Sequence, residues 1–267
     1  MTLGQIKKLM QQDNLVNMDT RTVLSGLKIS DYISPLDSLE AMSVFGKGMI
    51  LSSTTNHHHI STINHLSWLT NLKAKYDLFV TPCAINSMPG WVKTDLEITR
   101  EDGKYFKIIG VDVTISNREV SSWSQPLVQP MQDGLCAFII KRINGIYHFL
   151  VQAKLECGNL DVLEIAPTVQ CLTGAVLKDT YNKPEFYDYI INAQRRQVIT
   201  DTLQSEEGGR FYHEQNRSII VEADESFPLS LPPRYTWMTL SQMYEFLQFN
   251  NYLNIQARSL LSLINYI

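Results

Sequence analysis

The spacing of apolar residues changes along the chain and separates helical stretches from strands. Between residues 63 and 77 leucines recur every three positions, which is typical of an amphipathic helix, and Pro35 marks the start of another. From residue 79 to about residue 170 apolar and polar positions alternate, and this period of two predicts strands. Beyond them we expect a proline-opened helix over residues 184–204 and a strand over residues 217–223.

Two short polar signals mark hairpins among the predicted strands. Glu101-Asp102-Gly103 separates one pair of alternating runs, and Asn144-Gly145 separates another. Asn and Gly readily adopt the left-handed backbone that a tight hairpin turn requires. Each signal therefore predicts an antiparallel pair of strands.

One sequence pattern occurs near both ends of the chain. Residues 1–25 align without a gap to residues 238–262, an offset of 237. In each copy a threonine can cap a helix, an asparagine can end it, and a second short helix carries an arginine, Arg21 or Arg258. This arginine either ties backbone carbonyls together at a packing seam or binds a ligand. The interval indicates one period of a tandem repeat.

These patterns predict a single α+β unit with helical arms at both ends. The expected boundaries are residues 1–30 for the first arm, 31–235 for the central unit and 236–267 for the second arm. A proline-marked connector, residues 227–235, leads into the second arm.

Composition narrows the class of protein. The chain has 267 residues, 44% of them hydrophobic and 19% charged, which suffices for a sizeable core. A net charge of −4 gives no electrostatic footprint for nucleic acid or an anionic membrane. No apolar stretch reaches the ~18 residues of a membrane span, and no signal-peptide pattern opens the chain. The four cysteines form no C-x-x-C pair, so we expect a cytoplasmic protein without a zinc site or disulfide framework.

The histidine run His57-His58-His59, with His65 nearby, is the most obvious candidate for metal binding. Consecutive side chains in a strand cannot all face one ion, and no carboxylate lies at ligand spacing. We therefore expect a polar loop here and no metal site.

The run Gln152-Ala-Lys154-Leu-Glu156 places three polar side chains on one face of a predicted strand, because side chains alternate. A lysine and a carboxylate that lie close together can tune each other for proton transfer. The alternative is an exposed sheet face with an ordinary ion pair.

Two further segments carry groups suited to binding. Trp123 and Gln125, which we expect at a strand end, combine an aromatic face with an amide that could stack a base and bind hydroxyls; a core tryptophan is the alternative. Pro167 and Thr168 turn the chain and present Gln170, a donor and acceptor, although the pattern favours a structural turn over a binding role.

Residues 204–217 concentrate charge around a Gly-Gly turn. Glu206 is a candidate catalytic carboxylate, and Arg210 or Arg217 could clamp a diphosphate through paired hydrogen bonds. Tyr212 and Asn216 complete the candidate binding set. A glutamate-rich helix end with solvated arginines is the alternative.

Several segments together resemble the NDP-hexose 2,3-dehydratase family over roughly residues 63–264. They are MPGWVKTDLEITREDGKYFKIIGVDVTI, EVSSWSQPLVQP, HFLVQAKLECGNLDVLEIAPTVQ, LQSEEGGRFYHEQNRSIIVE and RYTWMTLSQMYEFLQFNNYLNIQARSLL. The resemblance implies a Nudix-like mixed β-sheet flanked by helices. The Glu206-Glu-Gly-Gly run is similar to the end of a Nudix box, but Thr202 and Leu203 stand where that box needs Arg and its first Glu. Metal-dependent pyrophosphate hydrolysis is therefore disfavoured.

The resemblance also implies a reaction: loss of water across C2 and C3 of a thymidine-diphosphate-linked 4-keto-6-deoxyhexose, in deoxysugar biosynthesis, giving a 3,4-diketo sugar passed to a 3-ketoreductase. Lys154, Glu156 and Glu206 would carry the proton transfers, and no cofactor or metal is expected, because the C4 ketone already acidifies the C3 proton. The alternative is a catalytically silent unit that binds a nucleotide sugar or a partner. Family members carry two units in tandem and this chain has one, so the resemblance further implies a homodimer.

Overall fold

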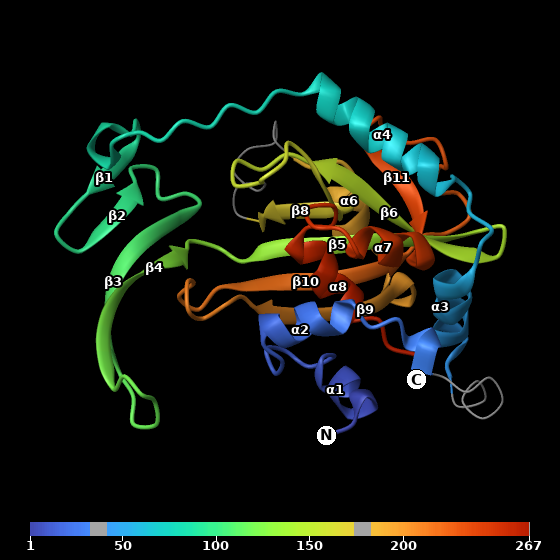
Figure 1. The fold of residues 1–267 in the computed structure, drawn as a ribbon, viewed down its shortest axis with the longest axis horizontal. Coiled ribbons are helices and arrows are strands. Elements are labelled where there is room, and N and C mark those ends of the chain that lie inside the picture. The colour runs from blue at the N-terminus through green and yellow to red at the C-terminus, as the bar shows by residue number, and fades with distance from the viewer. Residues whose placement is uncertain (33–41, 174–182, 267) are drawn as a thin grey trace.

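The molecule is built on two β-sheets of different size (Figure 1). The computed structural model describes residues 1–32, 42–173 and 183–266. A seven-stranded sheet, here the large sheet, forms the centre of the body with helices on both faces, and a four-stranded small sheet projects beside it. This arrangement confirms the α+β class, whereas the Nudix-like assignment stays a prediction. The helix expected from Pro35 lies outside the described residues.

The element bounds are as follows. The helices are α1 (Leu3–Leu9), α2 (Met18–Ser25), η1 (Ile29–Tyr32), α3 (Val44–Thr54), α4 (Thr62–Lys75), η2 (Ile85–Ser87), α6 (Tyr187–Ile191), η4 (Arg195–Gln197), α7 (Leu240–Leu247) and α8 (Ile255–Ser262). The strands are β1 (Trp91–Lys93), β2 (Glu97–Arg100), β3 (Phe106–Thr114), β4 (Ser122–Pro130), β5 (Gly134–Ile143), β6 (Ile146–Lys154), β7 (Glu164–Pro167), β8 (Val169–Leu172), β9 (Val198–Ser205), β10 (Gln215–Glu222) and β11 (Tyr235–Thr239).

The large sheet is mixed and splits at one end. Its order is β11-β6-β5-β10-β9, with β5 and β10 parallel. Strands β5 and β6 pair only as far as Ile139 and Leu150; beyond this point β7 pairs with β6 and β8 with β5. Thr168 sits at the fork, where its hydroxyl accepts from the Ile139 N–H at 2.9 Å and donates to the Leu150 carbonyl. Both buried backbone groups are thus satisfied while the strands separate.

Each face of the large sheet has its own hydrophobic core. On one face Phe138 and Phe149 meet edge to face at 5.4 Å and pack under α2, α3, α4, α7 and α8. On the other face Trp237 and its neighbours pack against Tyr187 and Ile190 of α6. Burial of these large apolar side chains stabilises the sheet by about 2 kcal/mol for each side chain removed from water.

The two copies of the repeated segment fold alike and pack against each other. Thr2 and Thr239 cap α1 and α7 with the same capping box, and Asn14 and Asn251 both take left-handed φ values of 57° and 62°. Helix α2 packs on α8, and Lys7 Nζ donates to the Ser262 carbonyl at 2.5 Å. The apolar faces of the two copies therefore find partners within one chain.

Most predicted elements are present, with one clear error. Helix α4, strand β10 and both hairpins lie where the pattern placed them, with Gly103 and Gly145 at positive φ. The helix predicted over residues 184–204 is wrong: α6 is short, and β9 follows from Val198. The run Val-Ile-Thr-Asp-Thr is rich in β-branched residues and buries alternate side chains, so it pairs with β10 as a strand.

The small sheet is a single layer. Strands β1 to β4 form an antiparallel meander, and neither hydrophobic cluster in the described parts of the chain includes one of their side chains. Leu96 is 85% exposed and Val120, beside β4, is 59% exposed. An isolated sheet of this kind normally needs a covering layer.

None of the helices in the described ranges combines the length and apolar character that crossing a membrane requires.

Candidate active site

A pocket of about 290 Å³ opens where β5 and β6 separate. Strand β8, inserted at the fork, forms one wall, and the end of β6 and the starts of β5, β10 and α8 form the others. The lining residues are Cys136, Lys154, Glu156, Gln170, Cys171, Leu172, Glu214, Asn216 and Gln256. The pocket thus gathers two carboxyl groups, an amine and several amides, and it includes four of the residues singled out from sequence: Lys154, Glu156, Gln170 and Asn216.

Gln170 organises the Lys154–Glu156 side of the pocket. Its Nε2 donates to Glu156 Oε1 at 3.1 Å, and its backbone carbonyl accepts from Lys154 Nζ at 3.4 Å. Asn254, the N-cap of α8, donates to Gln170 Oε1 at 2.8 Å and so fixes which end of the amide faces Glu156. Lys154 and Glu156 therefore share one polar partner in Gln170.

Glu206 lies beside this pocket, in a small adjoining cavity with Arg21 and Asn216. Asn216 Nδ2 donates to Glu206 Oε1 at 2.6 Å. Burial raises the pKa of Glu206, while the charge of Arg21 and the Asn216 hydrogen bond oppose that rise. Gly134 makes room for this contact, because a Cβ there would lie 1.8 Å from Asn216 Oδ1.

Arg21, which belongs to the N-terminal repeat copy, lies at the site beside Glu206. The residue is 1% exposed, and its guanidinium donates to the carbonyls of Val16 and Ser205, each at 2.7 Å. Arg258 makes the equivalent bond to the Leu253 carbonyl at 3.0 Å. The carbonyl-tying role considered for these arginines is thus present in both copies, and Arg21 in addition lies close enough to Glu206 to affect its charge.

Sequence reasoning missed Glu214, Cys136 and Gln256, which all line the pocket. Burial, followed by the charge of Glu206, raises the pKa of Glu214 to about 7. Strand alternation could have identified Glu214, since it stands two residues before Asn216 and shares its face. Gln256 could be found only by knowing that α8 packs on this edge.

Gln152 lies behind the pocket and not in its wall. The side chain is buried, and its Nε2 donates to the carbonyls of Pro167 at 2.9 Å and Thr168 at 3.2 Å. It therefore holds the β7–β8 connection in place.

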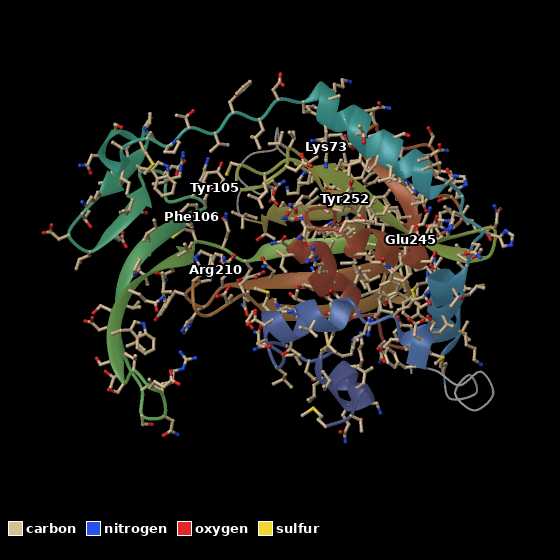
Figure 2. The ribbon with its side chains drawn as sticks, in the orientation of Figure 1. Lys73, Tyr105, Phe106, Arg210, Glu245 and Tyr252 are labelled. Carbon is tan, nitrogen blue, oxygen red and sulfur yellow. The ribbon has the colours of Figure 1, made fainter. Side chains whose placement is uncertain are left out.

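Four predicted binding residues lie apart from the pocket, on β4 and on the β9–β10 connection near the joint between the two sheets. Trp123 lies at the start of β4, not at a strand end as predicted, and its Nε1 donates to Gln125 Oε1 at 2.7 Å. Gln125 in turn donates to the Gly209 carbonyl at 2.8 Å. Figure 2 shows Arg210 at this joint, where it pairs with Glu207, and Tyr212 stacks on His213 nearby. Trp123 borders a separate open groove of about 700 Å³ with residues 116–120.

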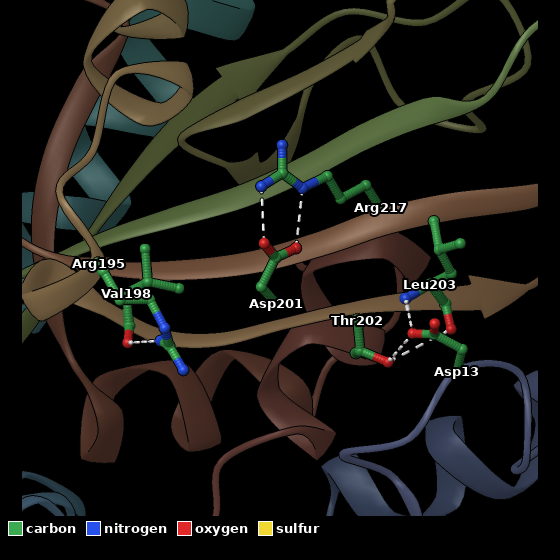
Figure 3. Close-up of polar contacts among 7 residues, drawn as sticks. All are labelled: Asp13, Arg195, Val198, Asp201, Thr202, Leu203 and Arg217. Atoms are coloured by element: carbon green, nitrogen blue, oxygen red, sulfur yellow. Dashed lines mark hydrogen bonds and ion pairs between the residues drawn. The ribbon is translucent and has the colours of Figure 1, made fainter.

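Arg217 points to the opposite face of the sheet from Asn216. Both of its paired nitrogens donate to the Asp201 carboxylate, at 2.8 and 2.7 Å (Figure 3). Figure 3 also shows Thr202 and the Leu203 N–H bonded to Asp13 of the N-terminal copy. The two positions that interrupt the Nudix-like box thus anchor the repeat segment.

The histidine run forms a loop, as predicted, but two nearby histidines are buried. His59 N–H donates to His148 Nε2 at 3.2 Å, and His65 lies 3.3 Å from the Thr236 hydroxyl. No three His, Cys, Asp or Glu side chains within the described ranges are grouped to hold a metal ion.

Comparison with known proteins identifies the family. A model of the NDP-hexose 2,3-dehydratase family matches residues 62–264. The chain belongs to this family. A curated dTDP-4-dehydro-6-deoxy-α-D-glucopyranose 2,3-dehydratase of Saccharopolyspora spinosa is 41% identical over 98% of this chain and 54% of its own length. Proteins of the same name from Streptomyces violaceoruber and Amycolatopsis orientalis are 40% and 38% identical, over 96% and 99% of this chain and 55% and 51% of their lengths.

This chain spans about half the length of the curated relatives it matches. The family match begins at residue 62, so Arg21 comes from a segment outside it. In chemical terms, the pocket offers carboxyl groups that can accept or donate protons and an ammonium that can stabilise developing negative charge.

Proposed function

We propose that the chain is a lyase that removes water across C2 and C3 of a thymidine-diphosphate-linked 4-keto-6-deoxyhexose. The observation that carries this proposal is the pocket in which Lys154 and Glu156 meet through Gln170, beside Glu206, in a chain of the 2,3-dehydratase family. The names of the relatives support the choice of nucleotide and sugar.

The chemistry needs a base, a stabilised enolate and an acid. In this proposal Glu156 removes the C3 proton, which the C4 ketone acidifies, and the Lys154 ammonium stabilises the oxygen that gains negative charge. The C2 hydroxyl then leaves as water, a C2–C3 double bond forms, and the resulting enol becomes the 3,4-diketone. A 3-ketoreductase would consume this labile product. The nucleotide-binding roles of Trp123, Gln125, Arg210, Tyr212 and Arg217 stay predictions.

The test is turnover by the purified chain and by Glu156→Gln. The substrate is incubated with a ketoreductase that traps the diketone, and product is followed by mass. Glu156→Gln keeps the shape and the contact with Gln170 but removes the base, so turnover should fall ~10²–10⁴-fold while substrate binding persists. Glu225→Gln, which removes an exposed carboxylate in the turn after β10, is the matched control. Full turnover by Glu156→Gln would show that another group is the base.

We further expect the elimination to require neither metal nor nicotinamide. Activity should survive exhaustive chelation, and deuterium placed at C3 should be released to solvent, because the base removes that proton. Loss of activity with EDTA and rescue by magnesium would instead favour the metal-dependent Nudix alternative.

A second candidate function is a silent unit that binds the nucleotide sugar without turnover, which the half-length match favours. Binding by calorimetry without product would identify it. For either function we propose a homodimer, supported by the uncovered small sheet and by relatives about twice as long as this chain.

A further inference from the structure

Glu214 lines the pocket from the residue before β10. It stands immediately before β10, after His213, whose left-handed φ of 52° turns the chain into the strand. The Glu206 N–H donates to the Glu214 carbonyl at 2.9 Å, so the β9–β10 ladder extends to this residue. Alternation then places its side chain on the same face as Asn216, and both line the pocket.

Among the residues that the structure describes, the carboxyl of Glu214 differs from its neighbours in having no direct partner. Glu156 accepts from Gln170, Glu206 from Asn216 and Glu207 from Arg210. In the ranges that the structure describes, no side-chain hydrogen bond or ion pair involves Glu214. A partly buried carboxyl without a partner, facing a pocket, is available to a ligand.

The surroundings of Glu214 favour its protonated form. Burial raises the pKa of Glu214 most, and the negative charge of Glu206 raises it further. Arg21 and Asn216 in turn stabilise the ionised form of Glu206. With a pKa of about 7, the carboxyl holds a proton in a large share of molecules at neutral pH and can release it. The other titratable groups lining the pocket are Lys154, Glu156, the buried thiol of Cys136 and the partly buried thiol of Cys171.

We propose that Glu214 is the general acid that protonates the departing C2 hydroxyl. This assignment rests on the proposed dehydratase function. As the base takes the C3 proton, the electron pair of that C–H bond forms the C2–C3 double bond by way of the enolate, and the C2–O bond breaks. Glu214 gives its proton to the leaving oxygen, water departs, and the carboxylate is later reprotonated from solvent. The two proton transfers thus fall to different carboxyl groups.

Solvent exchange separates these two steps. With substrate in D₂O, Glu214→Gln should lose water elimination by ~10²–10⁴-fold yet still incorporate deuterium at C3, because the base is intact. Glu156→Gln should lose both, and Glu225→Gln, at an exposed carboxylate in the turn after β10, should lose neither. Elimination by Glu214→Gln at the wild-type rate, or loss of C3 exchange together with elimination in a variant that still binds substrate, would overturn the assignment.

A second variant keeps the test valid even if Glu214→Gln folds poorly. Glu206→Gln retains an acceptor for Asn216 but removes the charge that raises the pKa of Glu214, so the alkaline limb of the kcat profile should move to lower pH. An unmoved limb would contradict the proposal. If the wild-type chain itself neither exchanges C3 nor eliminates water, the dehydratase function fails, and that result differs from a failure confined to Glu214.

Discussion

At the scale of single residues, Asn254 links the architecture of the chain to its pocket. Its Oδ1 caps α8 by accepting from the Ala257 N–H at 2.9 Å, and its Nδ2 donates to Gln170. Gln170 is thereby oriented with its own NH₂ toward Glu156. The Asn254 side chain thus caps α8 and also fixes the direction of the hydrogen bonds that run through Gln170 to Glu156, the proposed base.

We expect Asn254→Asp to separate these two tasks. Aspartate caps helices about as well as asparagine, so the free energy of unfolding should change by less than ~1 kcal/mol. Without the Nδ2 donor, Gln170 is drawn to turn its NH₂ toward the new carboxylate and its oxygen toward Glu156, which disturbs the base. We expect kcat to fall by roughly tenfold, a loss of about 1.4 kcal/mol. Asn17→Asp, at the equivalent cap of α2, is the control and should leave kcat unchanged; equal kcat in both variants would exclude the relay.

At the scale of elements, two buried histidines tie α4 and the loop before it to the large sheet: His148 joins that loop to β6, and His65 joins α4 to β11. His148 Nδ1–H donates to the Ile146 carbonyl at 2.9 Å, which leaves Nε2 to accept from His59 and requires a neutral ring. Burial lowers the pKa of both His148 and His65 to about 4. The contact between His148 and the loop therefore depends on an uncharged imidazole.

The resulting pH dependence has a definite sign. An unfolded histidine binds a proton near pH 6.5, so between about pH 6.5 and 4 the unfolded chain holds more protons than the folded one. Stability should be level above pH 6.5 and fall below it, by about 2 kcal/mol for each histidine at pH 5. Urea unfolding at pH 7.5 and 5.0 measures this. His148→Gln should reduce the difference in unfolding free energy between the two pH values, and the exposed His213→Gln should not. The same difference in all three proteins would contradict the assignment.

At the scale of the whole molecule, local signals were readable from the sequence and long-range placement was not. Asn144-Gly145 encodes its turn in two residues, and the capping threonines act within one helical turn, so these predictions are confirmed. The pocket instead depends on β8 entering between β5 and β6 and on α8 packing nearby. From sequence we assign Trp123 and Arg217 to the same site because of the chemistry of their side chains. Because side chains alternate along a strand, however, Arg217 and Asn216 have to lie on opposite faces of the sheet.

The small sheet gives the proposed dimer a specific test. If a second copy covers this sheet, light scattering at micromolar concentration should report twice the chain mass, and Leu96→Asp should shift the protein to monomer by placing a charge in the contact. Leu160→Asp, in a body loop and 89% exposed, is the control and should remain dimeric. A wild-type protein that scatters as a single chain would rule the dimer out.

The packing of the first repeat copy on the last has a consequence for synthesis. The contact between Lys7 and Ser262 spans 255 positions, and Glu156 is held through Gln170 by Asn254. During synthesis β5 and β6 can therefore pair before α8 has left the ribosome. Until then Asn254 cannot hold Gln170 against Glu156, the proposed base. Contacts of such large sequence separation form late and slowly. The protein should consequently acquire this pocket late in folding, after most of its secondary structure has formed.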